Sequence, residues 1–185
     1  ALAIASRMQE INSVTIGDPS VRSAFDMALY DIAAKAANMP LYQFLGGEQR
    51  ELRTDLTIGI KGTVEETVAQ AKSIIEAGFN AIKLKVGRPG LDDVPHVRAV
   101  RELIGPNMAL KMDSNQGWDY PTAVANINAM EELNLQYAEQ PIAVWDYEGL
   151  ARLRKKVNLP ICADESVFDH RDALKLAKMG AVDYL

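Results

Sequence analysis

Two lysines and three acids in this 185-residue sequence have types and spacing that could perform chemistry. Lys83 and Lys85 stand two positions apart in an apolar run, so on a β-strand both side chains would point to one face. Asp113, Glu139 and Asp164 each close one of the next three apolar runs. Three carboxylates at one height would repel one another strongly unless a cation offset their charge. The pattern therefore predicts a metal site beside a pair of lysines.

Magnesium is the ion that this donor set favours. Mg²⁺ takes hard oxygen ligands in an octahedron and keeps several positions for water or substrate, so three protein oxygens leave room for a substrate carboxylate. The alternative is that each acid caps the following helix or pairs with a surface lysine, which is the commoner fate of any single Asp or Glu. The register of three acids beside two lysines on one strand face favours the metal.

The elements that must hold these side chains repeat from about residue 54 onward. Short runs rich in Ile, Leu and Val alternate with segments of helical periodicity, in units of about 25 residues that fit one strand, one helix and two loops. The runs start near Asp55, Ala81, Met108, Gln136, Leu159 and Val182. Such units imply a parallel sheet, and the lack of a glycine-rich dinucleotide fingerprint favours a TIM-type barrel over a doubly wound sheet. Active sites of such barrels are built at the C-terminal ends of the strands.

The helices between these runs have recognisable ends. Thr63 and Glu66 have the spacing of a capping box, and Gly78 stands where a left-handed C-terminal cap is expected. The next helix begins at Asp92 or Asp93, either of which can act as its N-cap. The pattern therefore predicts regular strand-helix units throughout this part of the chain.

Residues 1–50 do not share this rhythm. Pro19 opens a long helical stretch with small residues at three- and four-residue steps, and Pro40 helps to end it. We therefore assign residues 1–50 to the end of a separate helical subdomain and residues 51–185 to the barrel. A closed barrel of this type needs eight strands, whereas six runs are visible and the last stops at Leu185. The sequence thus predicts a fragment of a longer protein.

Composition excludes several classes of protein. The chain is 48% hydrophobic and 24% charged, as in an ordinary globular domain, and its net charge of -5 with no extended basic cluster argues against nucleic acid as a partner. No apolar run approaches the roughly 18 residues needed to cross a bilayer, and no secretory signal opens the chain. The single Cys162 cannot make an internal disulfide, which fits a reducing, cytoplasmic setting.

The two histidines, the single cysteine and Trp118 are expected to have structural rather than catalytic roles. His96 and His170 are expected on helices, facing solvent. Cys162 is expected to pack, because nothing nearby in the sequence supplies the base that a nucleophilic thiol needs. Trp118 is expected to pack rather than to recognise the substrate. Asn115 follows Asp113 by two residues, and its side chain could hydrogen-bond to Asp113 and so orient that metal ligand.

Together the motifs resemble a known family. The run KLKVG, followed by DSNQGW, EQP and ADES at the next strand ends, is similar to the enolase superfamily and specifically to its muconate lactonizing enzyme subgroup. The resemblance covers essentially the whole chain. It implies that residues 1–50 are the C-terminal helical part of an α+β capping domain. It implies that residues 51–185 are the first part of an α/β fold, a TIM-like (β/α)7β barrel truncated after about six strands.

The resemblance also implies a role for each candidate residue. Asp113, Glu139 and Asp164 match the Mg²⁺ ligands, Lys85 matches the general base, and Lys83 matches a catalytic lysine that helps to hold the substrate carboxylate and depresses its neighbour's pKa. The implied reaction removes a proton alpha to a carboxylate. Water stabilises the resulting dianion poorly, whereas a metal and a nearby ammonium stabilise the charge where it develops. Lys85 must be neutral to accept the proton.

Within the subgroup the chain looks most similar to dipeptide epimerases of the L-Ala-D/L-Glu type, which are isomerases. The resemblance implies a dipeptide substrate, contacted by Thr57, and a homo-oligomer. Thr57 could equally be an ordinary β-branched strand residue. The alternatives are an o-succinylbenzoate synthase, an N-acylamino acid racemase or a muconate cycloisomerase, and the second base of an epimerase would lie beyond Leu185. A hypothesis of another class is an incomplete, non-catalytic barrel fragment with a structural role.

Overall fold

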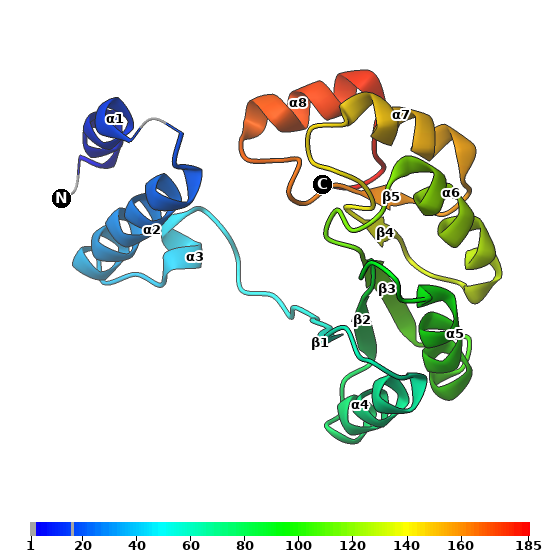
Figure 1. The fold of residues 1–185 in the computed structure, drawn as a ribbon. Helices are drawn as coiled ribbons and strands as arrows, with labels where there is room; N and C mark the ends of the chain where they lie inside the picture. Colours follow the sequence, from blue (N-terminus) through cyan, green and yellow to red (C-terminus); the bar gives the residue numbers. More distant parts are fainter. Residues whose placement is uncertain (1–2, 16) are drawn as a thin grey trace. The chain divides into compact units, whose positions relative to one another are not determined.

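The computed structural model describes residues 3–15 and 17–185. The chain divides between Arg53 and Thr54 into two compact units, the first helical and the second built on a parallel sheet (Figure 1). Among the described helices, none combines the length and apolar character that a membrane span requires.

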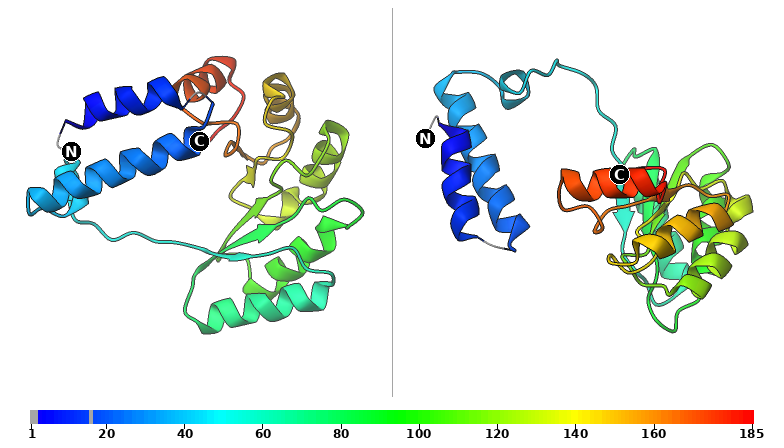
Figure 2. Two further views of the ribbon diagram at one scale, coloured as in Figure 1. Left: turned by 60° about the vertical axis from the view of Figure 1, so that its left-hand side comes forward. Right: turned by 90° about the horizontal axis from the view of Figure 1, so that it is seen from above.

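The first unit contains the helices α1 (Ile4–Val14), α2 (Pro19–Ala36) and α3 (Leu41–Phe44). Helix α1 lies antiparallel beside α2 (Figure 2). Proline fits the first turn of α2 because the N–H it lacks would have no partner within the helix. Apolar side chains such as Phe25 and Met27 are half exposed or more, and the two buried hydrophobic residues described in this unit are Ala33 and Ala34.

The second unit alternates strands and helices as the sequence predicts. Its elements are β1 (Leu56–Ile58), α4 (Val64–Glu76), β2 (Ala81–Lys85), α5 (Asp93–Ile104), β3 (Ala109–Asp113), α6 (Tyr120–Ala129), a 3-10 turn (Glu131–Leu133), β4 (Ala138–Glu139), α7 (Tyr147–Lys156), β5 (Ile161–Cys162) and α8 (His170–Met179). The five strands are parallel and follow one another in chain order across the sheet. The sixth predicted run makes a single parallel bridge, between Cys162 and Tyr184.

The predicted helix ends are present. The Thr63 side chain accepts a hydrogen bond from the Glu66 N–H, and the Glu66 carboxylate accepts one from the Thr63 N–H, which completes the capping box of α4. Gly78 follows α4 with a φ of +88°, a conformation that side-chain-bearing residues rarely adopt. At α5, Asp92 is the N-cap and accepts from the Val94 N–H.

The core lies between the sheet and its helices. Leu84, Leu110 and Met112 are at most 1% exposed and pack under α4 to α8, which cover one side of the sheet (Figure 1). Because side chains alternate along a strand, the residues between them, such as Lys85 and Lys111, project from the opposite face. The alternation of side chains therefore gives the same strands an apolar face toward the helices and a charged face on the other side.

The histidine prediction is wrong for His96 and correct for His170. His96 is 7% exposed, and its Nδ1 lies 2.8 Å from the Thr67 hydroxyl oxygen of α4. The reason is that α5 packs along α4, which closes over the side of α5 that His96 occupies. His170 begins α8 and is exposed, while Cys162 and Trp118 are both buried, as expected.

Candidate active site

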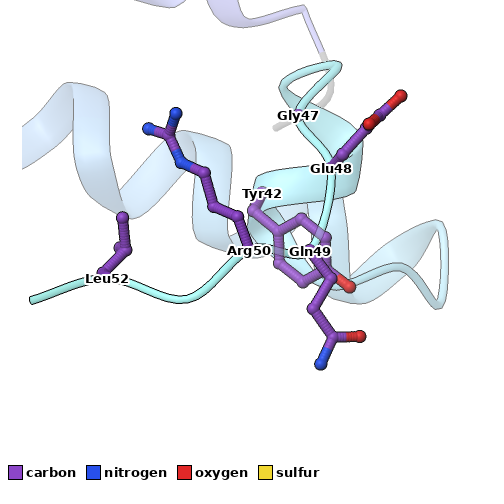
Figure 3. Close-up of a pocket in the computed structure, with 6 residues that line it drawn as sticks. All are labelled: Tyr42, Gly47, Glu48, Gln49, Arg50 and Leu52. Carbon is purple, nitrogen blue, oxygen red and sulfur yellow. The ribbon is translucent and has the colours of Figure 1, made fainter.

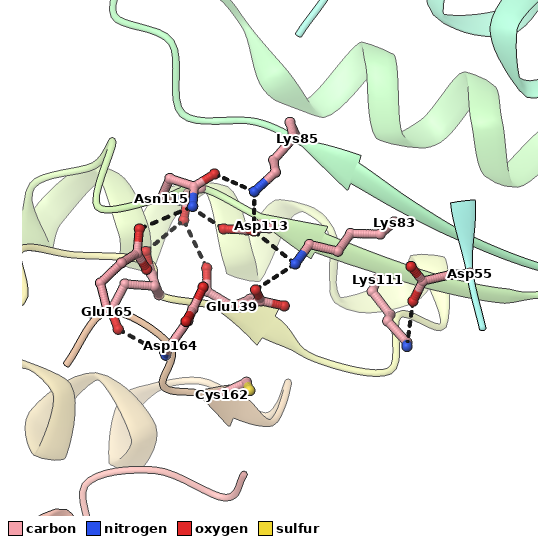
Figure 4. A network of polar contacts seen from close by, with 12 residues as sticks. Asp55, Lys83, Lys85, Lys111, Asp113, Asn115, Glu139, Cys162, Asp164 and Glu165 are labelled. Atoms are coloured by element: carbon pink, nitrogen blue, oxygen red, sulfur yellow. Dashed lines mark hydrogen bonds and ion pairs between the residues drawn. The ribbon is translucent and has the colours of Figure 1, made fainter. Parts of the chain in front are cut away.

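The candidate catalytic residues gather at the C-terminal ends of neighbouring strands (Figure 4). Strand register pairs Lys85 of β2 with Asp113 of β3, and Asp113 with Glu139 of β4. Lys83 lies two residues earlier on the same face of β2. The parallel order of the strands thus brings together side chains that are 28 to 56 positions apart in the sequence.

Short ion pairs join the lysines to the acids. Lys83 Nζ lies 2.9 Å from Asp113 Oδ2 and 2.5 Å from Glu139 Oε1. Lys85 Nζ lies 2.5 Å from the same Asp113 oxygen and 2.6 Å from Asn115 Oδ1. Asp113 is fully buried, so its charge depends on these two ammonium groups for compensation.

The pKa values of the two acids shift in opposite directions because Asp113 contacts both lysines, whereas Glu139 contacts Lys83. Burial acts to raise the pKa of Asp113, but hydrogen bonds from Lys85 and Lys83 outweigh burial and hold that pKa below its ordinary value. The pKa of Glu139 is raised, first by burial and further by the neighbouring Asp113 carboxylate. Burial lowers the pKa of Lys83, but its bonds to both acids dominate and raise it. Lys83 is therefore held as an ammonium group.

Asp164 reaches the same edge of the sheet but stands apart from this network. It follows β5, and its side chain is exposed. Among the residues that the structure describes, no three His, Cys, Asp or Glu side chains lie close enough together to hold a metal ion. The three acids occupy one edge, as the sequence predicts, while the two lysines hold Asp113 and Glu139.

The donor chemistry of this edge nevertheless fits a hard divalent cation. Asp113 and Glu139 present carboxylate oxygens side by side on adjacent strands, and Asp164 ends the next strand. Oxygen ligands of this kind are those that Mg²⁺ prefers. Burial and the neighbouring Asp113 carboxylate both act to raise the pKa of Glu139, so a nearby cation would favour its ionised form.

Gln140 links two loops of the candidate site, a role that its sequence position alone did not predict. It is fully buried, with a φ of +34°, and its Oε1 accepts hydrogen bonds from the backbone N–H groups of Asp164 and Ser166 at 3.1 and 3.0 Å. Its Nε2 donates to Ser166 Oγ at 2.8 Å. Gln140 thereby fixes the loop that carries Asp164 next to the strand that carries Glu139. Its place directly after Glu139 in the EQP motif was the available signal.

Asn115 contacts other residues of the candidate site from an unusual backbone conformation. Asn115 and Gln116 have φ angles of +41° and +67°, which is costly for residues other than glycine. The Asn115 N–H donates to Asp113 Oδ1 at 2.9 Å, and its Nδ2 donates to Glu165 Oε1 at 3.0 Å. Because Nδ2 is committed to Glu165, the amide oxygen faces Lys85. Glu165 was also missed by the sequence reasoning.

A second ion pair lies on the same face of the sheet, on the β1 side. Lys111 Nζ of β3 contacts Asp55 Oδ2 at 2.6 Å and stands 5.6 Å from the ring centre of Tyr137. Thr57 of β1 lies opposite Lys83 in the strand register, and its side chain is exposed. The face of the sheet that carries the acids is therefore also polar farther from the C-terminal ends of the strands.

A hollow of about 600 Å³ occurs in the helical unit (Figure 3). It is lined by Tyr42, Gly47, Glu48, Gln49, Arg50 and Leu52. None of the residues predicted to do chemistry lines it, so it is not the candidate active site.

Comparison with known proteins identifies the family. Residues 1–46 match the family model for the mandelate racemase / muconate lactonizing enzyme N-terminal domain, and residues 66–185 match that of the enolase C-terminal domain-like family. The chain belongs to the enolase superfamily. The resemblance to the muconate lactonizing enzyme subgroup and the α/β fold class predicted from the sequence are thereby confirmed.

Several curated members of this superfamily are similar to the chain. It is 40% identical over 169 residues to a hydrophobic dipeptide epimerase from Enterococcus faecalis, covering 90% of this chain and 47% of the relative. It is 35% identical over 181 residues to an L-Ala-D/L-Glu epimerase from Bacillus subtilis, covering 96% and 49%. The chain spans about half the length of the curated relatives it matches.

Solved structures of the superfamily have the same fold. A dipeptide epimerase from Cytophaga hutchinsonii, complexed with Mg and the dipeptide D-Ala-L-Val, superimposes with a TM-score of 0.93 at 37% identity, covering 99% of this chain and 50% of that one. An N-succinyl Arg/Lys racemase from Bacillus cereus gives a TM-score of 0.92 at 30% identity, covering 98% and 50%.

Proposed function

We propose that this chain is the first part of a Mg²⁺-dependent isomerase that removes and returns the proton alpha to a carboxylate, with dipeptides as substrates. One observation carries the proposal: two lysines of β2 lie within 2.5 to 2.9 Å of carboxylates that end β3 and β4 on one edge of a parallel sheet. The printed names of the similar epimerases support the choice of dipeptides. The longer protein is called the parent enzyme below.

The domain assignment is part of this proposal. Residues 1–50 are the C-terminal helical part of a capping domain, and residues 51–185 are the first part of a (β/α)7β barrel. Family matches over residues 1–46 and 66–185 support both assignments. The polar face of the sheet would then line the interior of the barrel, where the C-terminal strand ends form its mouth.

Asp113, Glu139 and Asp164 would hold the Mg²⁺ ion of the parent enzyme. A bound Mg²⁺ supplies positive charge that stabilises the negative charge developing on the substrate carboxylate as the α-proton leaves. Gln140 keeps the loop of Asp164 beside β4, so the three acids stay on adjacent strands. The relative from Cytophaga hutchinsonii was crystallised with Mg and a dipeptide, which supports this assignment.

Lys85 is the base and Lys83 the electrostatic partner in this scheme. Lys85 accepts the α-proton as a neutral amine, and Asn115 Oδ1 receives a hydrogen bond from the resulting ammonium group. Lys83 stays charged, because its bonds to the acids raise its pKa, and it attracts the substrate carboxylate. Thr57, opposite Lys83 on β1, would contact the substrate.

Racemisation of N-acylated amino acids is the second candidate. The N-succinyl Arg/Lys racemase of Bacillus cereus is 31% identical over 174 residues and shares the fold. Its substrates and dipeptides both carry an amide on the α-carbon beside the carboxylate. The chemistry of β2 to β5 therefore serves either class, and the distal part of the substrate distinguishes them.

Proton exchange in D₂O tests the proposal. The parent enzyme with Mg²⁺ is incubated with dipeptides and with N-succinylamino acids, and loss of the α-proton signal is followed by NMR. We expect exchange with dipeptides that is faster than with the N-succinyl compounds. Faster exchange with the latter favours the second candidate. No exchange with either class from a folded enzyme contradicts α-proton chemistry and favours a structural role for the barrel.

A further inference from the structure

A buried carboxylate outside the site links the two loops that carry Lys85 and Asn115. Asp93 is the first residue of α5 and is 3% exposed. Its Oδ2 accepts a hydrogen bond from the Gly87 N–H at 3.1 Å and another from the Trp118 indole Nε1 at 2.9 Å. One oxygen therefore receives donors from the loop after β2 and from the loop after β3.

The two loops touch through their backbones at this point. Gly87 has a φ of +89°, and a Cβ there would stand 2.7 Å from the Ser114 carbonyl oxygen. A Cβ on Gly117 would stand 2.2 Å from the Gly87 carbonyl oxygen. Such distances leave no room for a side chain at either position, so the two loops are in close backbone contact here. Asp93 lies beside this contact and bonds to one residue on each side of it.

Each loop carries a functional side chain within a few residues of the Asp93 bonds. Gly87 follows Lys85 by two residues, and Trp118 follows Asn115 by three. Lys85 Nζ and Asn115 Oδ1 are themselves 2.6 Å apart. A shift of one loop relative to the other would therefore change the place of the base relative to the acids and the substrate.

Helix capping does not account for this carboxylate. Asp92 already caps α5 by accepting from the Val94 N–H. Burial raises the pKa of Asp93, whereas the bonds from Trp118 and Gly87 lower it. A buried carboxylate is costly unless it is hydrogen-bonded, and at Asp93 both of the bonds that offset the cost go to the loops.

We propose that Asp93 is a positioning residue for the α-proton chemistry, which holds the Lys85 loop against the Asn115 loop and so sets where the base stands. The inference rests on the proposed function. Loss of Asp93 should displace Lys85 more than a second base on the other side of the substrate, because Asp93 bonds directly to the loop that follows Lys85.

The matched pair Asp93→Ala and Asp92→Ala separates positioning from stability in the parent enzyme. In Asp93→Ala we expect kcat for the substrate configuration deprotonated by Lys85 to fall by about 10- to 100-fold, with KM little changed, since a misplacement of about 1 Å can cost 100-fold. The kcat for the opposite configuration should fall clearly less. Asp92→Ala removes a cap and lowers the unfolding temperature, but should leave both rates unchanged.

Trp118→Phe gives a second variant should Asp93→Ala fold poorly. It keeps an aromatic ring in the packed position and removes only the N–H donor, so we expect the same configuration-selective loss in kcat at smaller amplitude. Equal loss for both configurations in Asp93→Ala and Trp118→Phe would overturn the proposal, as would full activity in both.

The indole NMR signals provide a readout that needs neither metal nor turnover. Trp118→Phe removes the Trp118 indole signal and so assigns it in the parent enzyme, and Trp145, which is 75% exposed, gives a solvent-exposed reference assigned by Trp145→Phe. In the metal-free parent enzyme we expect the Trp118 indole proton to exchange slowly with solvent. Asp93→Ala should shift this signal and speed its exchange, whereas Asp92→Ala should not.

The two readouts distinguish the possible failures. An unchanged Trp118 signal in Asp93→Ala would refute the link itself. A shifted signal with unchanged kcat would refute the positioning role while leaving the proposed function intact. A wild-type parent enzyme that shows the Trp118 signal but exchanges no α-proton would refute the proposed function, and with it the positioning role.

Discussion

Strands β2 and β3 carry an apolar face and, made of the alternating residues, a charged face that holds the proposed catalytic groups and is called the reactive face below. Leu84 and Met112 are at most 1% exposed under the helices, whereas their neighbours Lys85 and Asp113 point to the opposite side. The first face removes apolar area from water, which stabilises the fold by about 25 cal/mol per Å². The second face concentrates charge that contributes little to stability and must be compensated by ion pairs. Changes on the two faces should therefore have separable effects on stability and activity.

The reactive face should be most sensitive at the acids. Glu139→Gln keeps the size of the side chain and removes the charge, so we expect the parent enzyme to lose Mg²⁺ binding and detectable activity while keeping its fold. Mg²⁺ should bind the wild type in the millimolar range or tighter, as measured by isothermal titration calorimetry, with circular dichroism to check the fold. Unchanged Mg²⁺ binding in an Asp113/Glu139/Asp164 triple alanine variant would contradict the ligand assignment.

Substitution of Lys85 should slow α-proton exchange for one substrate configuration only. With a second base on the opposite side of the α-carbon, Lys85→Ala should lower α-proton exchange in D₂O for one configuration of a dipeptide by about 10²- to 10⁴-fold and leave measurable exchange for the other. Lys85→Arg should be no better, because a guanidinium is not deprotonated at working pH. Lys83→Ala should weaken substrate binding and slow exchange for both configurations. Equal loss in Lys85→Ala would instead favour a one-base elimination, such as o-succinylbenzoate synthesis.

The apolar face should show the opposite behaviour. Leu110 is fully buried between β3 and the helices, so Leu110→Ala should lower the free energy of unfolding by about 2 to 5 kcal/mol in urea titrations. The kcat of the enzyme that stays folded should not change. Leu110→Met, which nearly conserves volume, should cost less than about 1.5 kcal/mol. A fall in kcat at a temperature where Leu110→Ala is fully folded would show that the two faces are coupled.

The Asp55–Lys111 pair should contribute a smaller amount to stability. The two side chains are 19% and 23% exposed, and a double-mutant cycle with Asp55→Asn and Lys111→Met should give a coupling of about 1 kcal/mol at neutral pH. Burial lowers the pKa of Lys111, but Asp55 and Tyr137 outweigh it and raise that pKa above 10.5. The coupling should therefore be complete from neutral pH up to about pH 10.5 and be lost as pH rises through the raised pKa. A coupling that is already lost between pH 7 and the pKa of Lys111 would contradict the pair.

Local pattern was sufficient for much of this molecule. The capping box of Thr63 and Glu66, the alternation around Lys83 and Lys85, and the order of the strand-helix units all follow from residues close in sequence. Parallel strands in chain order then place Asp113 and Glu139 side by side without further information. The sequence could predict these features because helix caps and strand periods depend on neighbours within a few positions.

The tertiary structure alone decided which polar residues are buried and what they bind. Nothing local distinguishes Asp92, a helix cap, from Asp93, whose partner Trp118 is 25 residues away. The partner of Lys111 is 56 residues away, and that of His96 is on another helix. Such contacts form only when loops and helices from separate units pack together. A buried polar group then takes whichever donor or acceptor that packing brings within reach, because leaving it unpaired costs more than any local preference supplies.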